Sequence, residues 1–161
     1  MDPNNPVVRL CVRGMQAEAD GRADQAAGIF TAAWEAAGDD YERCIASHYV
    51  ARHQPNPTAT LEWNARCLAL ADAVGDERVA GFYPSLHLNL GRASEDLGRL
   101  DEARDHYAAA EGTFAVLPAD GYGAMVRSAV VRGLLRVGAV DARAADAGAA
   151  DAGEGLAGDA R

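Results

Sequence analysis

The sequence contains no lysine, so all 15 basic residues are arginine, and 24 acidic residues bring the formal net charge to -9. A duplex nucleic acid is bound by a basic face, which such an acidic chain lacks. The chain also has no apolar run near the roughly 18 residues of a membrane-spanning helix, and its start, MDPNNPVVRL, has no charged-then-apolar signal pattern. We therefore expect no nucleic-acid partner and no membrane partner.

Cysteine is scarce as well. Cys11, Cys44 and Cys67 form an odd set without close spacing, so the sequence has neither a disulfide framework nor a paired-cysteine zinc motif. This pattern predicts reduced thiols and a cytoplasmic location. The absence of lysine, together with abundant alanine and glycine, is typical of a high-GC bacterial genome.

Familiar catalytic and cofactor motifs are also missing. The chain has no Gly-x-Ser-x-Gly, no P-loop, no His-Glu-x-x-His and no dinucleotide fingerprint at a strand-to-helix turn. These absences favour a role that is not enzymatic, without deciding the question. They also predict that the protein carries no cofactor and no bound metal.

The strongest structural signal is the stretch from His87 to Ala110. It predicts two antiparallel helices joined by a tight turn at Leu97-Gly98-Arg99, because Gly98 can adopt the positive φ that ends a helix. Gly91 and Ala103 place small residues on the two arms, where the helices must approach each other closely. The stretch is therefore a helical hairpin with a tight interface.

The same spacing occurs a second time. The offsets of Gly91, Gly98, Ala103, Tyr107 and Ala110 are repeated by Gly14, Gly21, Ala26, Phe30 and Ala33. Repetition with a helical period is typical of a solenoid. Together with Leu90, this set resembles the tetratricopeptide repeat (TPR) family over about residues 7–117. The resemblance implies an all-α fold: a TPR-like antiparallel helix-pair solenoid of about three pairs plus a C-terminal capping helix.

We expect three segments along the chain. They are a disordered lead at 1–6, a TPR-like helical domain at 7–139 and a disordered Ala/Asp/Gly tail at 140–161, where too few apolar side chains offset the ordering entropy. Apolar periodicity and the glycine and proline breaks predict helices at about 7–20, 23–37, 41–53, 59–74, 78–97, 101–116 and 122–137.

The resemblance also implies a function. In the repeat family the first helix of each pair lines a concave groove, so we expect a protein-interaction scaffold that binds a peptide or a partner-protein helix there. The predicted groove residues are Tyr49, Arg52, His53, Tyr83, Ser85, Asn89 and Arg92. Arg52 and Arg92 could bind an acidic group, or could pair with surface acids. A short array also leaves an exposed end through which the protein could form a homo-oligomer.

A second interpretation stays open. The helices predicted at 41–53 and 78–97 carry His48, His53 and His87, which could form a small-molecule or metal-dependent site, enzymatic or not. Cys44 lies four residues before His48 on the same helix face. By its offset, however, His48 occupies the position of Gly14 and Gly91, which predicts a packed, hydrogen-bonded histidine instead.

Overall fold

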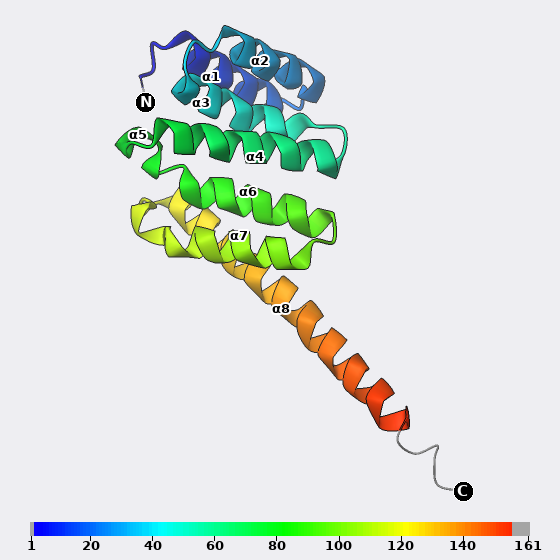
Figure 1. The fold of residues 1–161 in the computed structure, drawn as a ribbon. Helices are drawn as coiled ribbons and strands as arrows, with labels where there is room; N and C mark the ends of the chain where they lie inside the picture. The colour runs from blue at the N-terminus through cyan, green and yellow to red at the C-terminus, as the bar shows by residue number, and fades with distance from the viewer. Residues whose placement is uncertain (1, 156–161) are drawn as a thin grey trace, which may run out of the picture.

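The computed structural model describes the backbone of residues 2–155 and the side chains of residues 2–140. Within these residues all the regular secondary structure is helical and there is no strand, which confirms the all-α prediction (Figure 1). The α-helices are α1 (Pro6–Ala19), α2 (Ala23–Ala36), α3 (Asp40–Val50), α4 (Pro57–Val74), α5 (Glu77–Ala80), α6 (Tyr83–Asp96), α7 (Leu100–Gly112) and α8 (Gly121–Gly155), and the short 3-10 helices are η1 (Ala51–His53) and η2 (Phe114–Val116).

The helices pack against their neighbours in chain order. Helix α1 packs on α2, α3 on α4, and α6 on α7, and these pairs contact one another through α2 with α3 and through α4 with α6. Figure 1 shows the resulting stack, with α8 packed against α7 and α6 and then leaving the body of the molecule. The apolar side chains between successive helices form the core.

Local sequence signals start and stop the helices. The Asn5 side chain accepts hydrogen bonds from the backbone N–H groups of Val7 and Val8 and so caps α1. Gly21 and Gly98 adopt φ values of 75° and 72° just after α1 and α6, a conformation that costs glycine little. Pro6, which the sequence placed in the disordered lead, begins α1 instead, because proline suits the first turn of a helix.

Two glycines lie at close helix contacts, as the spacing predicted, but each faces an aromatic ring, whereas the sequence paired Gly91 with Ala103. A Cβ atom on Gly14 would collide with the ring of Phe30, and one on Gly91 would lie 2.6 Å from the ring of Tyr107. Both aromatic rings are fully buried. The helix pairs α1–α2 and α6–α7 can therefore approach only because these two positions have no side chain.

One predicted helix is broken in the structure. The sequence predicted a single helix at 78–97, whereas α5 ends at Ala80 and α6 begins at Tyr83. Pro84 lies in the first turn of α6, where its missing N–H would have no partner in any case. The link at Gly81 and Phe82 therefore separates a short extra helix from the third pair.

Helix α8 is held to the body by a polar network. Tyr107 donates a hydrogen bond of 2.6 Å to Glu95, and Arg136 of α8 binds the same carboxylate at 2.6 and 2.7 Å. A Cβ on Gly133 would lie 2.5 Å from the Tyr107 ring. This contact network orients α8, and with it the residues at its first turn.

Helix α8 also continues past residue 137, where the sequence predicted its end. The disordered tail predicted at 140–161 stays a prediction, because the side chains of 141–155 and all of residues 156–161 lie outside the described part. None of the described helices is both long enough and apolar enough to cross a lipid bilayer. The cytoplasmic location stays a prediction.

Candidate functional site

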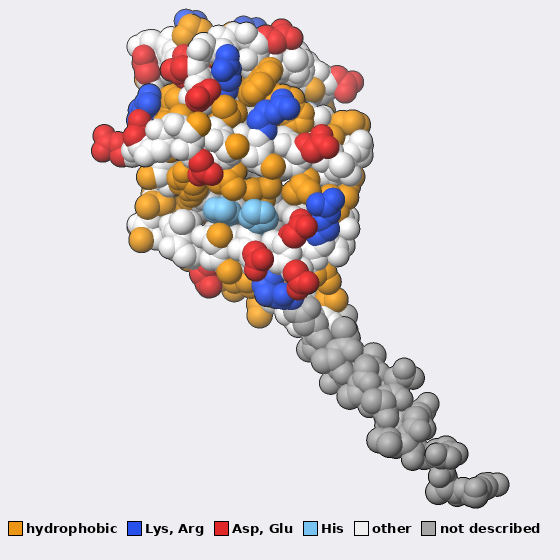
Figure 2. Space-filling model, viewed as in Figure 1, with side chains coloured by type: hydrophobic (Ala, Val, Ile, Leu, Met, Phe, Trp, Pro, Cys, Tyr) orange, Lys and Arg blue, Asp and Glu red, His pale blue; other side chains and the backbone are white. Residues whose placement is uncertain are grey.

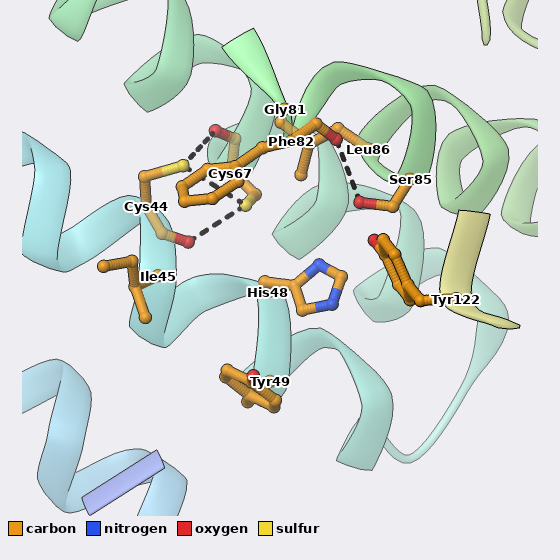
Figure 3. Close-up of a pocket in the computed structure, with 10 residues that line it drawn as sticks. All are labelled: Cys44, Ile45, His48, Tyr49, Cys67, Gly81, Phe82, Ser85, Leu86 and Tyr122. Carbon is orange, nitrogen blue, oxygen red and sulfur yellow. Dashed lines mark hydrogen bonds between the residues drawn. The ribbon is translucent and has the colours of Figure 1, made fainter. Parts of the chain in front are cut away.

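A cavity of about 340 Å³ lies between α3, α4 and α6, with the first turn of α8 at its edge (Figure 3). Most of its walls are apolar or aromatic. The lining residues are Cys44, Ile45, His48, Tyr49, Cys67, Gly81, Phe82, Ser85, Leu86 and Tyr122. Its volume falls within the range of pockets that bind small ligands, roughly 300–1,000 Å³.

The sequence of α3 explains one wall of the cavity. Cys44 and His48 are four residues apart, and so are Ile45 and Tyr49, so these residues share one side of the helix. Phe82, just before α6, stacks on Tyr41 of α3 with 6.2 Å between ring centroids. The link after the extra helix α5 thus packs against α3 and contributes Gly81 and Phe82 to the lining of the cavity.

His48 is the polar group at the centre of the site. Figure 3 shows its ring between the side chains of Tyr49, Ser85 and Tyr122, and its centroid lies 5.2 Å from that of Tyr49 in an edge-to-face contact. Within the described residues its ring nitrogens have no hydrogen-bond partner. Burial, assisted by the charge of Arg52, lowers the pKa of His48 to about 4, so the ring is neutral near pH 7 and offers one donor and one acceptor.

The thiols of Cys44 and Cys67 both line the cavity. The Sγ atoms of Cys44 and Cys67 lie 3.9 Å apart, and both residues are buried. Each thiol donates to the backbone carbonyl of the other residue, at 3.6 Å from Cys44 and 3.1 Å from Cys67. The pair joins α3 to α4, and Phe82 packs against the same cluster of buried residues.

The structure brings only part of the predicted groove set into the cavity. Tyr49 and Ser85 both line it. Arg52 and His53 instead bind Glu18 of α1, at 2.9 and 2.7 Å respectively. Arg52 also lies 5.9 Å above the ring of Tyr49. These two side chains therefore hold α1 against η1, the short helix that directly follows α3.

Tyr83 belongs to a different cluster, between α4, α6 and α7. Its hydroxyl donates to Asp72 at 2.8 Å, and its ring stacks on His87 at 6.3 Å. The Nδ1 atoms of His87 and His106 are 3.2 Å apart. Burial lowers the pKa of both histidines, and their mutual repulsion lowers that of His87 further. Figure 2 shows a face on which two neighbouring histidines lie among apolar and charged side chains.

The remaining two predicted residues lie on α6. Asn89 is partly buried and Arg92 is exposed, and neither is among the residues that line the cavity. Arg92 acts electrostatically on Glu95. A binding role for the seven predicted residues stays a prediction, with Tyr49 and Ser85 the two that meet at one cavity.

The histidines of the second interpretation are separated. His48 lines the cavity, His53 binds Glu18, and His87 pairs with His106. Among the described residues no group of three or more His, Cys, Asp or Glu side chains is arranged to hold a metal ion. The cavity therefore offers one histidine, not three.

Several lining residues were not among the predicted groove residues. Tyr122, which is 46% exposed at the cavity edge, belongs to α8. In the predicted array the helix after the last pair would take the place of another first helix, so its inward face could have been included in the prediction. Cys67 and Phe82 had no such signal, because a second helix of a pair and a link are not expected to line a groove.

Comparison with protein-family models, with curated protein sequences and with solved structures gave no match.

Proposed function

We propose that this protein is a TPR-like interaction module that holds a peptide or partner-protein helix along α1, α3, α6 and the start of α8. The repeated small-residue spacing and the stacked antiparallel pairs support this assignment. In such arrays the first helices of the pairs form one continuous surface that neighbouring units build together. The interaction is the function, and no catalytic step is part of the proposal.

The observation that carries the proposal is the cavity between α3 and α6. Its walls are aromatic and apolar, and a neutral imidazole without a partner in the described chain stands at its centre. Peptide grooves derive specificity from pockets that receive anchor side chains. Here an apolar or aromatic anchor would be buried against Tyr49 and Phe82, and a polar group on it would hydrogen-bond to His48.

The two predicted groove arginines differ in their ion pairs. Both are exposed, but Arg52 pairs with Glu18, whereas Arg92 forms no ion pair with another described residue. A carboxylate on the partner would therefore have to displace Glu18 before Arg52 could bind it. We expect Arg92→Ala to weaken binding of an acidic segment more than Arg52→Ala does.

Panning of the purified protein against randomised displayed peptides tests the proposal. Selected peptides are then measured by fluorescence anisotropy with wild type, Ser85→Trp and Ser128→Trp. The first variant fills the cavity, and the second places the same side chain at an exposed position of α8. We expect Ser85→Trp to raise Kd about tenfold or more, which is about 1.4 kcal/mol. The control variant should keep the wild-type Kd.

Either of two results would contradict the proposal. One is that panning enriches no peptide over a display without protein. The other is that the selected peptides bind Ser85→Trp and Ser128→Trp equally well. Circular dichroism of both variants shows whether each keeps the helical content of wild type.

A small-molecule site is the second candidate function. The observation in its favour is the unpartnered His48 ring inside a cavity of about 340 Å³, because ligand pockets combine apolar walls with a few polar groups. Ligand-observed NMR with a library of aromatic fragments uses the same two variants. Fragments that bind wild type and Ser128→Trp but not Ser85→Trp, with no enriched peptide, would favour this function over the first.

A further inference from the structure

The two thiols below the cavity are close enough to react with each other. Their sulfur atoms are 3.9 Å apart, although Cys44 and Cys67 are separated by 23 residues and lie on different helices. A disulfide needs a sulfur–sulfur distance of about 2.05 Å. The approach needed is under about 2 Å, which rotation of the two side chains and a small helix movement can supply.

The surroundings decide which reagent can reach the pair. Both side chains are almost completely buried, at 1% and 0% exposed, so a folded protein cannot contact them. Both also line the cavity. The cavity, at about 340 Å³, is many times the roughly 30 Å³ that a water molecule occupies in the liquid. At these exposures even a water-sized molecule barely touches the pair, so an oxidant reaches the sulfur atoms only when the cavity wall opens slightly, and hydrogen peroxide needs the smallest opening.

We propose that Cys44 and Cys67 are a dithiol site that hydrogen peroxide, entering through the cavity, converts to an intramolecular disulfide between α3 and α4. The site is reversible, because a small thiol reductant returns both cysteines to the thiol form. Formation of this disulfide does not depend on which partner the proposed groove binds.

The chemistry balances without a further reactant. The Cys67 sulfur attacks one peroxide oxygen, so an S–O bond forms, the O–O bond breaks, and hydroxide leaves and takes up the Cys67 proton as water. The Cys44 sulfur then attacks the Cys67 sulfur, the S–S bond forms, and the S–O bond breaks to release a second water. Two thiols lose two electrons and two protons, and one peroxide becomes two waters.

The hydrogen bonds favour Cys67 as the attacking thiol. The contact between the two thiols lowers the pKa of Cys67, and the same contact together with burial raises the pKa of Cys44. The thiolate is the reactive form of cysteine. Cys11 provides an internal comparison, because burial alone raises its pKa to about 12.

Peptide mapping of the wild-type protein tests the site. Trypsin cuts after arginine and so separates the three cysteines into the peptides 10–13, 44–52 and 67–78. The protein is treated with peroxide, unfolded, alkylated with N-ethylmaleimide and digested. We expect a disulfide-linked pair of peptides 44–52 and 67–78, an alkylated peptide 10–13, and loss of the linked pair after dithiothreitol.

Dimedone present while the wild-type protein is oxidised traps the sulfenic acid on the attacking sulfur, and we expect this adduct on peptide 67–78. Cys44→Ala and Cys67→Ala each remove the hydrogen bond between the two thiols, so in both variants we expect no linked pair of peptides and a slower reaction of the remaining cysteine. Circular dichroism checks that each variant is folded, and the wild-type map does not rely on either of them.

The proposal is overturned if peroxide oxidises Cys11 as fast as the pair. It is also overturned if the products are disulfides between molecules, over-oxidised single cysteines or unreacted thiols, each of which would mean that the two sulfurs do not meet in solution.

Discussion

The ring of Tyr107 on α7 lies directly against the backbone of Gly91 on α6, where an added Cβ would be 2.6 Å from the ring. The same ring lies against Gly133 of α8, where an added Cβ would be 2.5 Å from it, and the hydroxyl donates a hydrogen bond to Glu95. One aromatic side chain therefore sets the spacing of three helices. The position of α8, and of Tyr122 at the cavity edge, follows from this contact.

Gly91→Ala should destabilise the protein by about 1–3 kcal/mol, because the added methyl overpacks the contact with Tyr107. Gly28→Ala is the matched control: this glycine also lies inside a helix, and nothing lies within 4 Å of an added Cβ. The control should gain up to about 1 kcal/mol from improved helix propensity. Urea denaturation measures both, and equal effects of the two variants would contradict the role of Gly91.

Because of Glu95, the free energy of unfolding should decrease at acidic pH. The hydrogen bonds from Arg136 and Tyr107 hold the pKa of Glu95 below its ordinary value of 4.5. Its contribution is therefore complete above about pH 4.5 and is lost as the pH falls through the lower, folded-state pKa. The difference in free energy of unfolding between wild type and Glu95→Gln should shrink as the pH falls, and a constant difference would speak against the network.

His48 should titrate far from the usual range of histidine. Its pKa of about 4, against 6.5 for the free side chain, means that protonation favours the unfolded chain. The contribution of the neutral ring is present above about pH 6.5 and is lost as the pH falls through about 4. NMR of the ring carbons, assigned with His48→Gln, follows the titration; a midpoint near 6.5 would show that the ring is freely hydrated.

His106→Gln should raise the pKa of His87, because it removes a neighbour whose charge opposes protonation. The pKa should remain below 6.5, since burial is the larger cause of the depression. His53→Gln is the control, because His53 binds Glu18 and not His87. NMR titration of His87 reports both variants, and an unchanged pKa in His106→Gln would mean that the two rings do not interact.

The features predicted correctly depend on residues near one another in the chain. Gly21 and Gly98 end helices, and the small residues at 14 and 91 mark close helix contacts. Proline and glycine act on the backbone locally, so their effect can be read without knowledge of the fold. The link at Gly81 and Phe82 escaped prediction because the apolar period continues across it.

The residues that line the cavity could not be predicted from local sequence patterns, because distant parts of the chain form it together. His48 has the offset of a tightly packed glycine position, yet the structure places its ring in a cavity beside Tyr122, which is 74 residues away in the chain. His87, which the sequence grouped with His48, pairs with His106 instead. The cavity between α3 and α6 is lined in part by Gly81 and Phe82, which directly follow the extra helix α5 and had no local signal of a binding site.

The sequence alone determined the helical elements, their turns and the tight contacts within the first and third pairs, because backbone preference and residue spacing act over one or two helical turns. Tertiary structure alone decided that two distant cysteines meet, that the histidines separate and that an aromatic cavity opens between α3 and α6. Those outcomes depend on how whole helices are positioned, and a shift of a few ångströms between helices leaves no trace in the order of residues.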